Sequence, residues 1–145
     1  MRLILKPLFE VELPPEFVDI LRAKLKGREI KEGETIEIEL LGKNLAFKVL
    51  YAEPKELKVS EKTKVEFASE EILRLDFEFE KPIKEVIPFE KGIVVMFEYE
   101  ILILSEKGHK IYNEKFDGLR EVRIAKNLIA VIHDGGKKLT LIYIQ

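Results

Sequence analysis

Apolar residues alternate with charged or small ones throughout the stretch from residue 25 to residue 67. They recur at every second position in four short runs, at 36–40, 45–51, 57–59 and 65–67. Successive side chains of a strand point to opposite faces, so this period predicts strands with one buried and one solvated face. Glycine, asparagine and proline separate the runs, as turns require. The stretch therefore predicts a compact barrel or curled sheet of short strands.

A helical period precedes these runs. Apolar residues recur there at three- and four-residue intervals, at Phe17, Ile20, Leu21 and Leu25. Pro15 suits the first helical turn and Gly27 follows as a stop, so we expect one helix near residues 15–26, covering an open side of the sheet. The strand before it is expected to be peripheral, because Pro7 interrupts it and cannot donate to a ladder.

The second half of the chain repeats itself. A shift of 36 residues places Glu78 on Glu114 and the apolar run 93–96 on 129–132. A further slip of two residues at the glycine pair 135–136 extends the match to the last strand. Each copy is expected to contain four strands, at 73–79, 84–89, 92–97 and 101–104 in the first copy and at 110–115, 121–125, 128–133 and 139–144 in the second.

These patterns predict a mainly β fold with one α-helix, in which a small β-barrel is followed by two four-stranded antiparallel blade-like repeats. The expected domains are residues 1–68, a small β-barrel with one helix, and residues 69–145, a two-copy β-repeat. The copies are expected at 73–108 and 109–145. Because halves of this size bury little surface, each is expected to lean on the other half or on a second copy.

The first half resembles a known family. The helix is followed by these turn-rich segments: Gly27-Arg28-Glu29-Ile30, Lys31-Glu32-Gly33-Glu34-Thr35, Leu41-Gly42-Lys43 and Glu53-Pro54. Residues 13–67 thereby resemble the second, small β-barrel subdomain of the amino-terminal domain of valosin-containing-protein-type AAA ATPases, and of the related ubiquitin-fusion-degradation adaptor. In that family the subdomain packs beside a double-psi barrel, and the pair binds adaptors and substrates. We expect neither that second barrel nor an ATPase module here, so the family's cleft residues have no counterparts.

The repeat at 73–145 resembles the blades of quinoprotein-type or WD-type β-propellers, which have about 40 residues and four strands each. Two copies cannot close a ring that usually needs roughly four to eight blades. Three arrangements stay open: two sheets packed face to face, a sheet resting on the first barrel, or blades completed by a partner chain.

Composition excludes several functions. Charged residues make up 36% of the chain but nearly cancel to a net charge of -2, so we expect no nucleic-acid partner. The absence of cysteine rules out disulfides, thiolate nucleophiles and Cys-ligated zinc. No apolar run approaches the roughly 18–20 residues of a membrane span, so we expect no membrane partner and a soluble, cytoplasmic protein. The excess of Glu over Asp and the single glutamine are a thermophilic bias.

No catalytic, cofactor-binding or metal-binding residue is assigned, and no cofactor is expected. The two histidines, His109 and His133, are expected at the surface or in turns, because a metal or acid–base role would need partners from elsewhere in the fold. Acidic pairs at two-residue spacing, such as Glu37 and Glu39, are expected to line solvated sheet faces. Most aromatic residues of the first repeat copy are expected to pack in the core, with the first barrel covering Phe77 and Phe79, although outward-facing ones would make an interaction patch.

The leading hypothesis is a non-enzymatic protein-interaction module that binds adaptors or substrates in the manner of AAA ATPase amino-terminal domains. One alternative is a structural homo-oligomer assembled through β-sheet edges, since the apolar C-terminal strand 139–144 is expected to be an edge. Another is a small-molecule enzyme with an inter-domain pocket. The expected partners are therefore another protein or a second copy of this chain.

Overall fold

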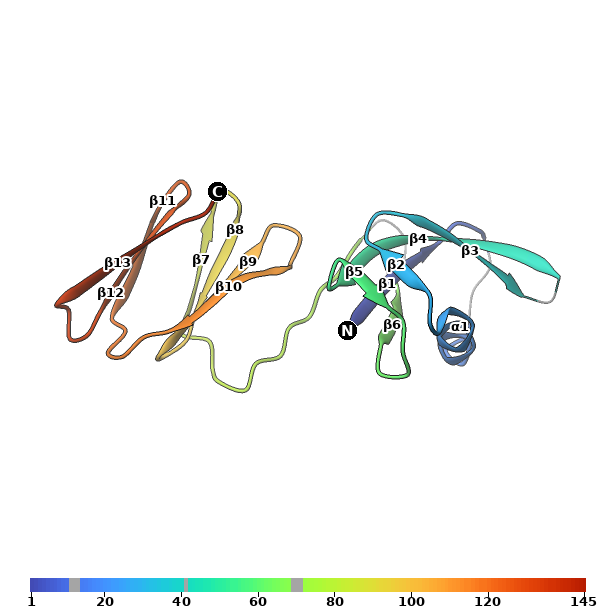
Figure 1. Ribbon diagram of the computed structural model, residues 1–145, viewed down its shortest axis with the longest axis horizontal. Helices are drawn as coiled ribbons and strands as arrows, with labels where there is room; N and C mark the ends of the chain where they lie inside the picture. The colour runs from blue at the N-terminus through green and yellow to red at the C-terminus, as the bar shows by residue number, and fades with distance from the viewer. Residues whose placement is uncertain (11–13, 41, 69–71) are drawn as a thin grey trace. The chain divides into compact units, whose positions relative to one another are not determined.

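The computed structural model describes residues 1–10, 14–40, 42–68 and 72–145. The chain forms two compact units, Met1–Arg74 and Leu75–Gln145, hereafter unit 1 and unit 2. Unit 1 contains helix α1 and strands β1 to β6, and unit 2 contains strands β7 to β13 (Figure 1). The mainly β fold class is confirmed, and α1 is the one helix in the described ranges. The division of the second half into copies 73–108 and 109–145 stays a prediction.

Helix α1 spans Phe17–Leu25 and buries one apolar face. Phe17, Leu21 and Leu25 are buried, whereas Ile20 is 47% exposed and lies outside that face. The helix begins where the carbonyl of Pro14 accepts a hydrogen bond from the N–H of Phe17 at 2.9 Å. It ends before Gly27, whose φ of +86° is a left-handed conformation that an L side chain would resist.

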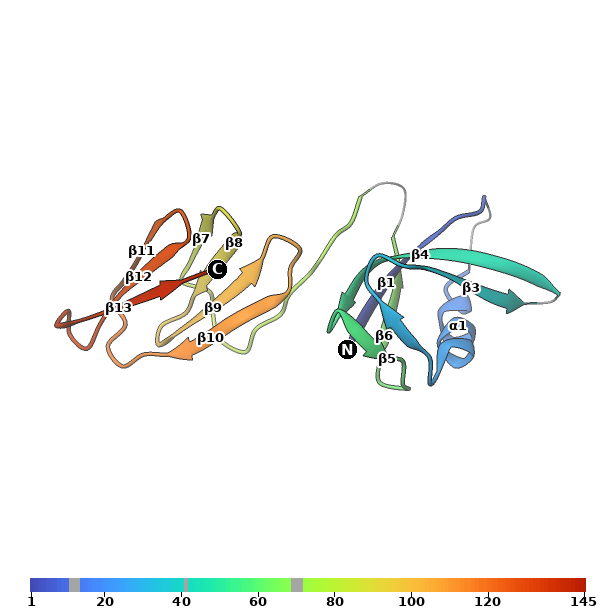
Figure 2. The ribbon, with the colours of Figure 1, turned by 45° about the horizontal axis from the view of Figure 1, so that its top comes forward.

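Six strands lie in the described residues of unit 1: β1 (Arg2–Pro7), β2 (Glu29–Lys31), β3 (Thr35–Leu40), β4 (Lys43–Glu53), β5 (Glu56–Lys58) and β6 (Lys64–Phe67). Four of them form a sheet in the order β3-β4-β1-β6, and β2 pairs with β5. The long strand β4, which curves through the unit in Figure 2, pairs with β3 along its first part and with β1 along its second. The charged members of β3, Glu37 and Glu39, are exposed as expected.

Strand β1 is central, so the prediction of a peripheral first strand is wrong. It pairs antiparallel with β4 on one side and parallel with β6 on the other. Leu3, Ile4 and Leu5 are 0 to 2% exposed. Pro7 does not disturb the ladder because it is the last residue of the strand. Together with α1 and the other strands, β1 supplies the single apolar core of unit 1, which includes Leu3, Leu5, Leu21, Leu25, Ile30, Phe47 and Val49.

The buried phenol of Tyr51 should make unit 1 sensitive to alkali. Tyr51 is 1% exposed, and its hydroxyl lies 3.4 Å from a carboxylate oxygen of Glu53. Burial, and then the negative charge of Glu53, raise the pKa of Tyr51 to about 12 from its ordinary 10.0. Because the folded pKa is the higher one, this stabilisation is complete below pH 10 and is lost as the pH rises through 12.

We therefore expect the free energy of unfolding to fall more steeply between pH 10 and 12 in the wild type than in Tyr51→Phe. Phenolate absorbance measured during an alkaline titration of both proteins checks the assignment. The last ionisation step, near pH 12, should be missing from Tyr51→Phe. Persistence of that step in the variant would assign it to another tyrosine.

Unit 2 consists of seven strands: β7 (Glu85–Phe89), β8 (Gly92–Met96), β9 (Glu100–Ser105), β10 (Lys110–Lys115), β11 (Glu121–Ala125), β12 (Leu128–His133) and β13 (Lys138–Tyr143). All neighbouring strands are antiparallel. They form one four-stranded sheet, β10-β9-β8-β7, and one three-stranded sheet, β11-β12-β13. The C-terminal strand β13 is thus an edge of its sheet, as predicted.

The two sheets of unit 2 pack face to face, which is one of the three arrangements left open by the sequence. Val94, Met96, Ile101 and Ile103 of the first sheet share a core with Val122, Ile129 and Val131 of the second. On the opposite face of the first sheet, the alternate residues Val95, Leu102 and Leu104 of the same strands form a second cluster with Phe97, which follows β8. We call this opposite face, defined by those four residues, the back face.

The strand predicted at residues 73–79 is absent from the structure of the single chain. Phe77 and Phe79 instead pack against the back face of their own unit, and their cover by the first barrel stays a prediction. The first sheet reaches four strands because it recruits β10, which the sequence assigned to the second copy. The first sheet therefore contains the last three strands predicted for the first copy and the first strand predicted for the second copy. The second sheet contains the three strands that remain.

Candidate interaction surfaces

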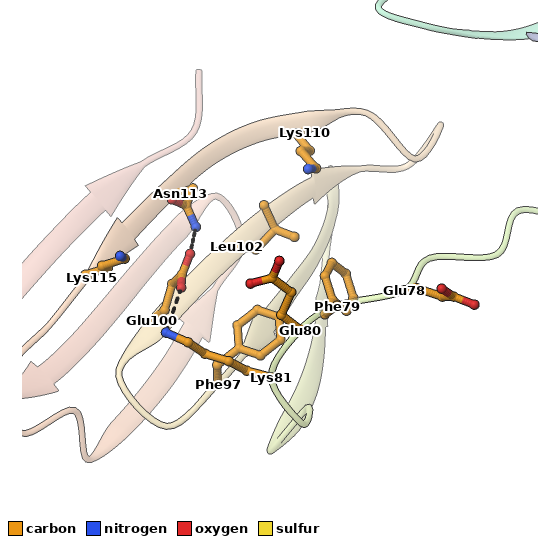
Figure 3. Close-up of a pocket in the computed structure, with 10 residues that line it drawn as sticks. All are labelled: Glu78, Phe79, Glu80, Lys81, Phe97, Glu100, Leu102, Lys110, Asn113 and Lys115. Carbon is orange, nitrogen blue, oxygen red and sulfur yellow. Dashed lines mark hydrogen bonds and ion pairs between the residues drawn. The ribbon is translucent and has the colours of Figure 1, made fainter. Parts of the chain in front are cut away.

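The back face of unit 2 carries an open hollow of about 620 Å³. Figure 3 shows the rings of Phe79 and Phe97 at its base, and their centroids lie 5.1 Å apart in an edge-to-face arrangement. Phe97 belongs to the turn after β8, and Phe79 comes from the segment that precedes β7. The apolar base is thus made by two chain segments that are distant in sequence.

Charged side chains of both signs surround this hollow. Glu100 contacts the side-chain amide of Asn113 and lies 3.8 Å from the ammonium nitrogen of Lys81 (Figure 3). Lys110 and Lys115 of β10 contribute two more positive charges to the lining. An open, apolar-based hollow with a mixed charged rim suits contact with another polypeptide better than the orientation of a small substrate.

A second apolar surface lies on β13. Leu139, Leu141 and Tyr143 alternate along the strand and are 63, 44 and 64% exposed. The intervening residue Ile142 instead packs against the core shared by the two sheets. Exposed apolar residues that share one face of a strand at the end of its sheet are typical of a protein interface.

His133 closes a local hydrogen-bond chain on the hairpin of β12 and β13. Its Nδ1 lies 2.7 Å from a carboxylate oxygen of Asp134, and its Nε2 lies 2.7 Å from the hydroxyl of Thr140. The ring also packs against Phe116 at a centroid distance of 4.8 Å. A histidine held between a carboxylate and a hydroxyl has the connectivity of a general base. Here all three polar groups belong to one hairpin and fasten its two strands together.

The sequence analysis missed these contacts. It expected partners of His133 to come from elsewhere in the fold, whereas Asp134 is the next residue and Thr140 lies across the hairpin. Asp134 directly follows His133 in the sequence, so the contact between them could have been predicted. Thr140 could be found only once β12 and β13 were paired in register, with His133 opposite Lys138.

His109 is buried, at 6% exposure, so of the two positions expected for it, the surface or a turn, only the turn remains. It lies in the turn between β9 and β10, where its N–H donates to the hydroxyl of Ser105 at 3.1 Å. The N–H of Ser105 in turn donates to the carbonyl of His109 at 2.8 Å. The two reciprocal bonds fix the turn that brings β10 beside β9.

In the described parts of the chain, the His, Asp and Glu side chains form no group of three that could hold a metal ion. Across the same residues, no helix is long and apolar enough to cross a membrane. The acidic residues Asp76, Glu78 and Glu80, which alternate before β7, are exposed to solvent. Among the aromatic residues of unit 2, Phe97 is buried, whereas Tyr99 and Tyr112 are 55 and 40% exposed.

The fold is thus a small β-barrel with one helix joined to a two-sheet β-repeat. Residues 12–72 match the family described as cell division protein 48 (CDC48), domain 2, which confirms the resemblance of the first half. Residues 74–144 match a domain of unknown function, DUF6849. A search of curated proteins finds no match.

The chain belongs to the same family as Ph1500 of Pyrococcus horikoshii. The crystal structure of Ph1500 is 39% identical over 99% of this chain and 100% of that chain, with a TM-score of 0.55. Its solution structure, described as a homohexameric protein centred on a 12-bladed β-propeller, is 40% identical over 99% of this chain and 96% of that one, with a TM-score of 0.47. The isolated N-terminal domain of Ph1500 is 46% identical over 48% of this chain and 91% of that one, with a TM-score of 0.44.

Proposed function

We propose that this protein is a non-enzymatic, self-assembling protein-interaction module. Unit 2 of several copies forms a closed ring of stacked sheets, and unit 1 of each copy binds a protein partner. The partner is an adaptor or a substrate, bound in the manner of the AAA ATPase amino-terminal domains that unit 1 resembles.

The observation that carries the assembly is a difference in burial between equivalent residues of the two repeat copies. Ile101 and Ile103 of β9 are 0% exposed, because the second sheet covers them. Their equivalents in the repeat, Leu139 and Leu141 of β13, are 63 and 44% exposed. Stacked repeats bury each apolar face against the next repeat. The exposure of this β13 face is therefore evidence that a sheet from another copy packs upon it in the assembly.

The back face of the next copy suits this position. Residues 140 and 142 of β13, which face the first sheet of their own chain, are the repeat equivalents of Leu102 and Leu104 on the back face. The contact between copies would therefore repeat the contact inside each chain. Such a head-to-tail interface closes into a ring when the rotation allows. Ph1500 is described as a hexamer with twelve blades, which is two per copy, and unit 2 has two sheets. We accordingly infer a ring of six copies.

A charge on the exposed face of β13 should prevent assembly. In Leu139→Lys, an ammonium group would be buried against the next copy without a partner, and burial of that kind is strongly unfavourable. Size-exclusion chromatography with light scattering should give six times the 16.9 kDa chain mass for the wild type and one chain mass for the variant. A single-chain mass for the wild type would contradict the proposal.

Tyr99→Lys is the matched control. Tyr99 is 55% exposed, close to the 63% of Leu139, but it lies in the turn between β8 and β9. We expect this variant to keep the mass of the wild type. Loss of assembly in both variants would show that any added charge disrupts the oligomer, and the role assigned to the β13 face would be wrong.

The role of unit 1 needs a separate test, because a purely structural homo-oligomer would assemble equally well and bind nothing. The match of residues 12–72 to CDC48 domain 2 supports a protein partner. We expect a tagged full-length chain to co-purify with a partner under gentle conditions, and Leu139→Lys to retain a single-site affinity for it. Recovery of the chain alone would favour the structural homo-oligomer.

A further inference from the structure

Strands β7 and β11 lie at the ends of their sheets that are farthest from β10 and β13. Within the described ranges, each of them pairs with one neighbour only, β7 with β8 and β11 with β12. The shift of 36 residues that relates the two repeat copies places β7 exactly on β11. A strand at the end of a sheet presents N–H and C=O groups to which another polypeptide can bond, unless a residue blocks them.

The edge of β7 is blocked by a proline. The N–H of Phe97 donates to the carbonyl of Glu100 at 2.8 Å, which fixes the pairs that bond β8 to β9. Bonded pairs alternate along an antiparallel ladder, so Val94 of β8 turns its N–H and C=O to β7. In the register of that ladder, Val86 and Pro88 of β7 are turned to the free edge. Because proline has no N–H, the edge offers only the donor of Val86.

The edge of β11 has no such block. The N–H of Ile144 donates to the carbonyl of Asn127 at 2.9 Å, which fixes the pairs that bond β12 to β13. By the same alternation, Val122 and Ile124 of β11 turn their N–H and C=O groups to the free edge. Ile124 is the repeat equivalent of Pro88. Strand β11 therefore keeps both donors, whereas β7 keeps one.

An open hollow of about 460 Å³ lies between these two strands, and we call it the β7–β11 groove. Its apolar lining comes from Ile87 and Phe89 of β7 and from Val122 and Ile124 of β11. Val122 is buried, and the other three are half-buried. An extended segment bonded to the edge of β11 would direct every second side chain toward this lining. Apolar side chains suit those positions.

The charges around the groove differ between its two sides. Glu85 and Glu90 lie at the two ends of β7, whereas Arg123 lies on β11 and Lys126 in the turn after it. Glu121 of β11 contacts Arg123, so the β11 side has two positive charges against one negative charge. Opposite charges on neighbouring strands attract each other. A segment beside β11 would therefore be favoured by an acidic residue next to Arg123.

We propose that the β7–β11 groove binds an extended segment of a partner protein in which apolar and acidic residues alternate. The main chain of the segment bonds to Val122 and Ile124, its apolar side chains fill the groove, and its acidic side chains lie beside Arg123. This site is separate from the one proposed on unit 1. It lies within one chain, away from β13 and the back face, so it does not depend on the ring.

Ile124→Pro tests the site, because it gives β11 the residue that β7 has at the equivalent position. The N–H that it removes is turned to the groove, and the first sheet already accommodates Pro88 at the same place, so the variant should fold. The probe is a fluorescein-labelled octapeptide that alternates valine with glutamate. Fluorescence anisotropy should show that it binds the wild type, and that Ile124→Pro weakens this binding at least about tenfold.

Two controls accompany this variant. Ile124→Val keeps the N–H and removes one methylene group, so its affinity should stay within about threefold of the wild type. Equal losses in both variants would mean that the side chain, and not the main chain, makes the contact, and would overturn the proposed mode of binding. An octapeptide that alternates valine with lysine should bind more weakly. Equal affinity for the two peptides would overturn the assignment of an acidic partner.

Amide exchange followed by NMR locates the peptide without any proline substitution, and so decides the question even if Ile124→Pro fails to fold. In Leu139→Lys, expected to be a single chain of 16.9 kDa, the amides of Val122 and Ile124 should exchange fast and become slow when the valine–glutamate peptide is added. The amide of Arg123, which bonds to β12, should be slow in both states. Unchanged exchange at Val122 and Ile124 in the presence of bound peptide would overturn the site.

The failure of this inference is distinguishable from that of the proposed function. Leu139→Lys should bind the peptide as tightly as the wild type, whatever mass light scattering gives for either protein. Binding by the assembled wild type alone would show that the site needs a second copy, and binding by the variant alone would show that assembly covers it. Either result would overturn the inference and leave the ring standing.

Discussion

Replacement of Gly92 by alanine is expected to unfold unit 2. Gly92 opens β8 and lies opposite Ser105 of β9. A Cβ atom at this position would lie 1.9 Å from the carbonyl oxygen of Leu104 and 2.9 Å from its carbonyl carbon. Both are backbone atoms of the neighbouring strand, so no side chain can rotate away to make room. The two strands must separate where the central pair of the sheet begins.

We expect Gly92→Ala to lower the free energy of unfolding of unit 2 by more than about 3 kcal/mol, at the upper end of what single substitutions do. Hydrogen–deuterium exchange followed by mass spectrometry reports the two units separately in the full chain. Exchange should rise throughout β7 to β10 and remain slow in β1 and β4 of unit 1. The proposed ring should be lost as well, because its interfaces are proposed to lie on unit 2.

Gly135→Ala provides the comparison for this substitution. Gly135 has a φ of +71°, and a Cβ there would meet nothing within 4 Å. The expected destabilisation is therefore limited to the cost of a left-handed L residue, about 1–2 kcal/mol. Equal effects of the two substitutions would mean that β8 and β9 relax around the added Cβ atom, and that the contact with Leu104 does not set the requirement for glycine at position 92.

Local burial could be predicted from the sequence, but distant pairing could not. The alternation at 36–40 predicted β3 correctly, since Ile36 and Ile38 are buried and the glutamates beside them are exposed. The position of β1 depended on partners about fifty and sixty residues away, Ala52 on one side of Leu3 and Val65 on the other. The alternation of apolar and polar residues along a strand does not indicate which strands will lie beside it. The proline near its end was therefore taken as the sign of an edge.

The pairing of the segment at 73–79, which lies on the back face of unit 2, could not be predicted from the sequence either. Its alternation is that of a strand, and its apolar residues are partly buried, yet the chain alone offers it no ladder. The period of apolar residues predicts which side chains are buried. It does not predict which neighbouring strand forms hydrogen bonds with the backbone. The exposed face of β13 was equally hidden, because a residue such as Leu139 has the sequence pattern of its buried equivalent Ile101.

Truncation of Phe47 should unfold unit 1 and leave the ring intact. Phe47 is 0% exposed in the middle of β4, where the strand passes from pairing with β3 to pairing with β1. Its ring meets Phe9 edge-to-face at 5.3 Å and stacks on Phe67 at 6.0 Å. Phe47→Ala is expected to cost about 3–5 kcal/mol, because it leaves a cavity where three aromatic residues meet. For a unit of this size such a loss approaches the whole free energy of unfolding.

Leu8→Ala serves as the control, since Leu8 is 50% exposed and its truncation should change stability by about 0.5 kcal/mol or less. In Phe47→Ala, hydrogen exchange should become fast in β1, β3, β4 and β6, while light scattering still gives the mass of the ring. The partner should no longer co-purify, because unit 1 is the part that we propose binds it. Collapse of the ring together with unit 1 would show that the barrel also holds the copies together, and the separation of assembly from binding would have to be abandoned.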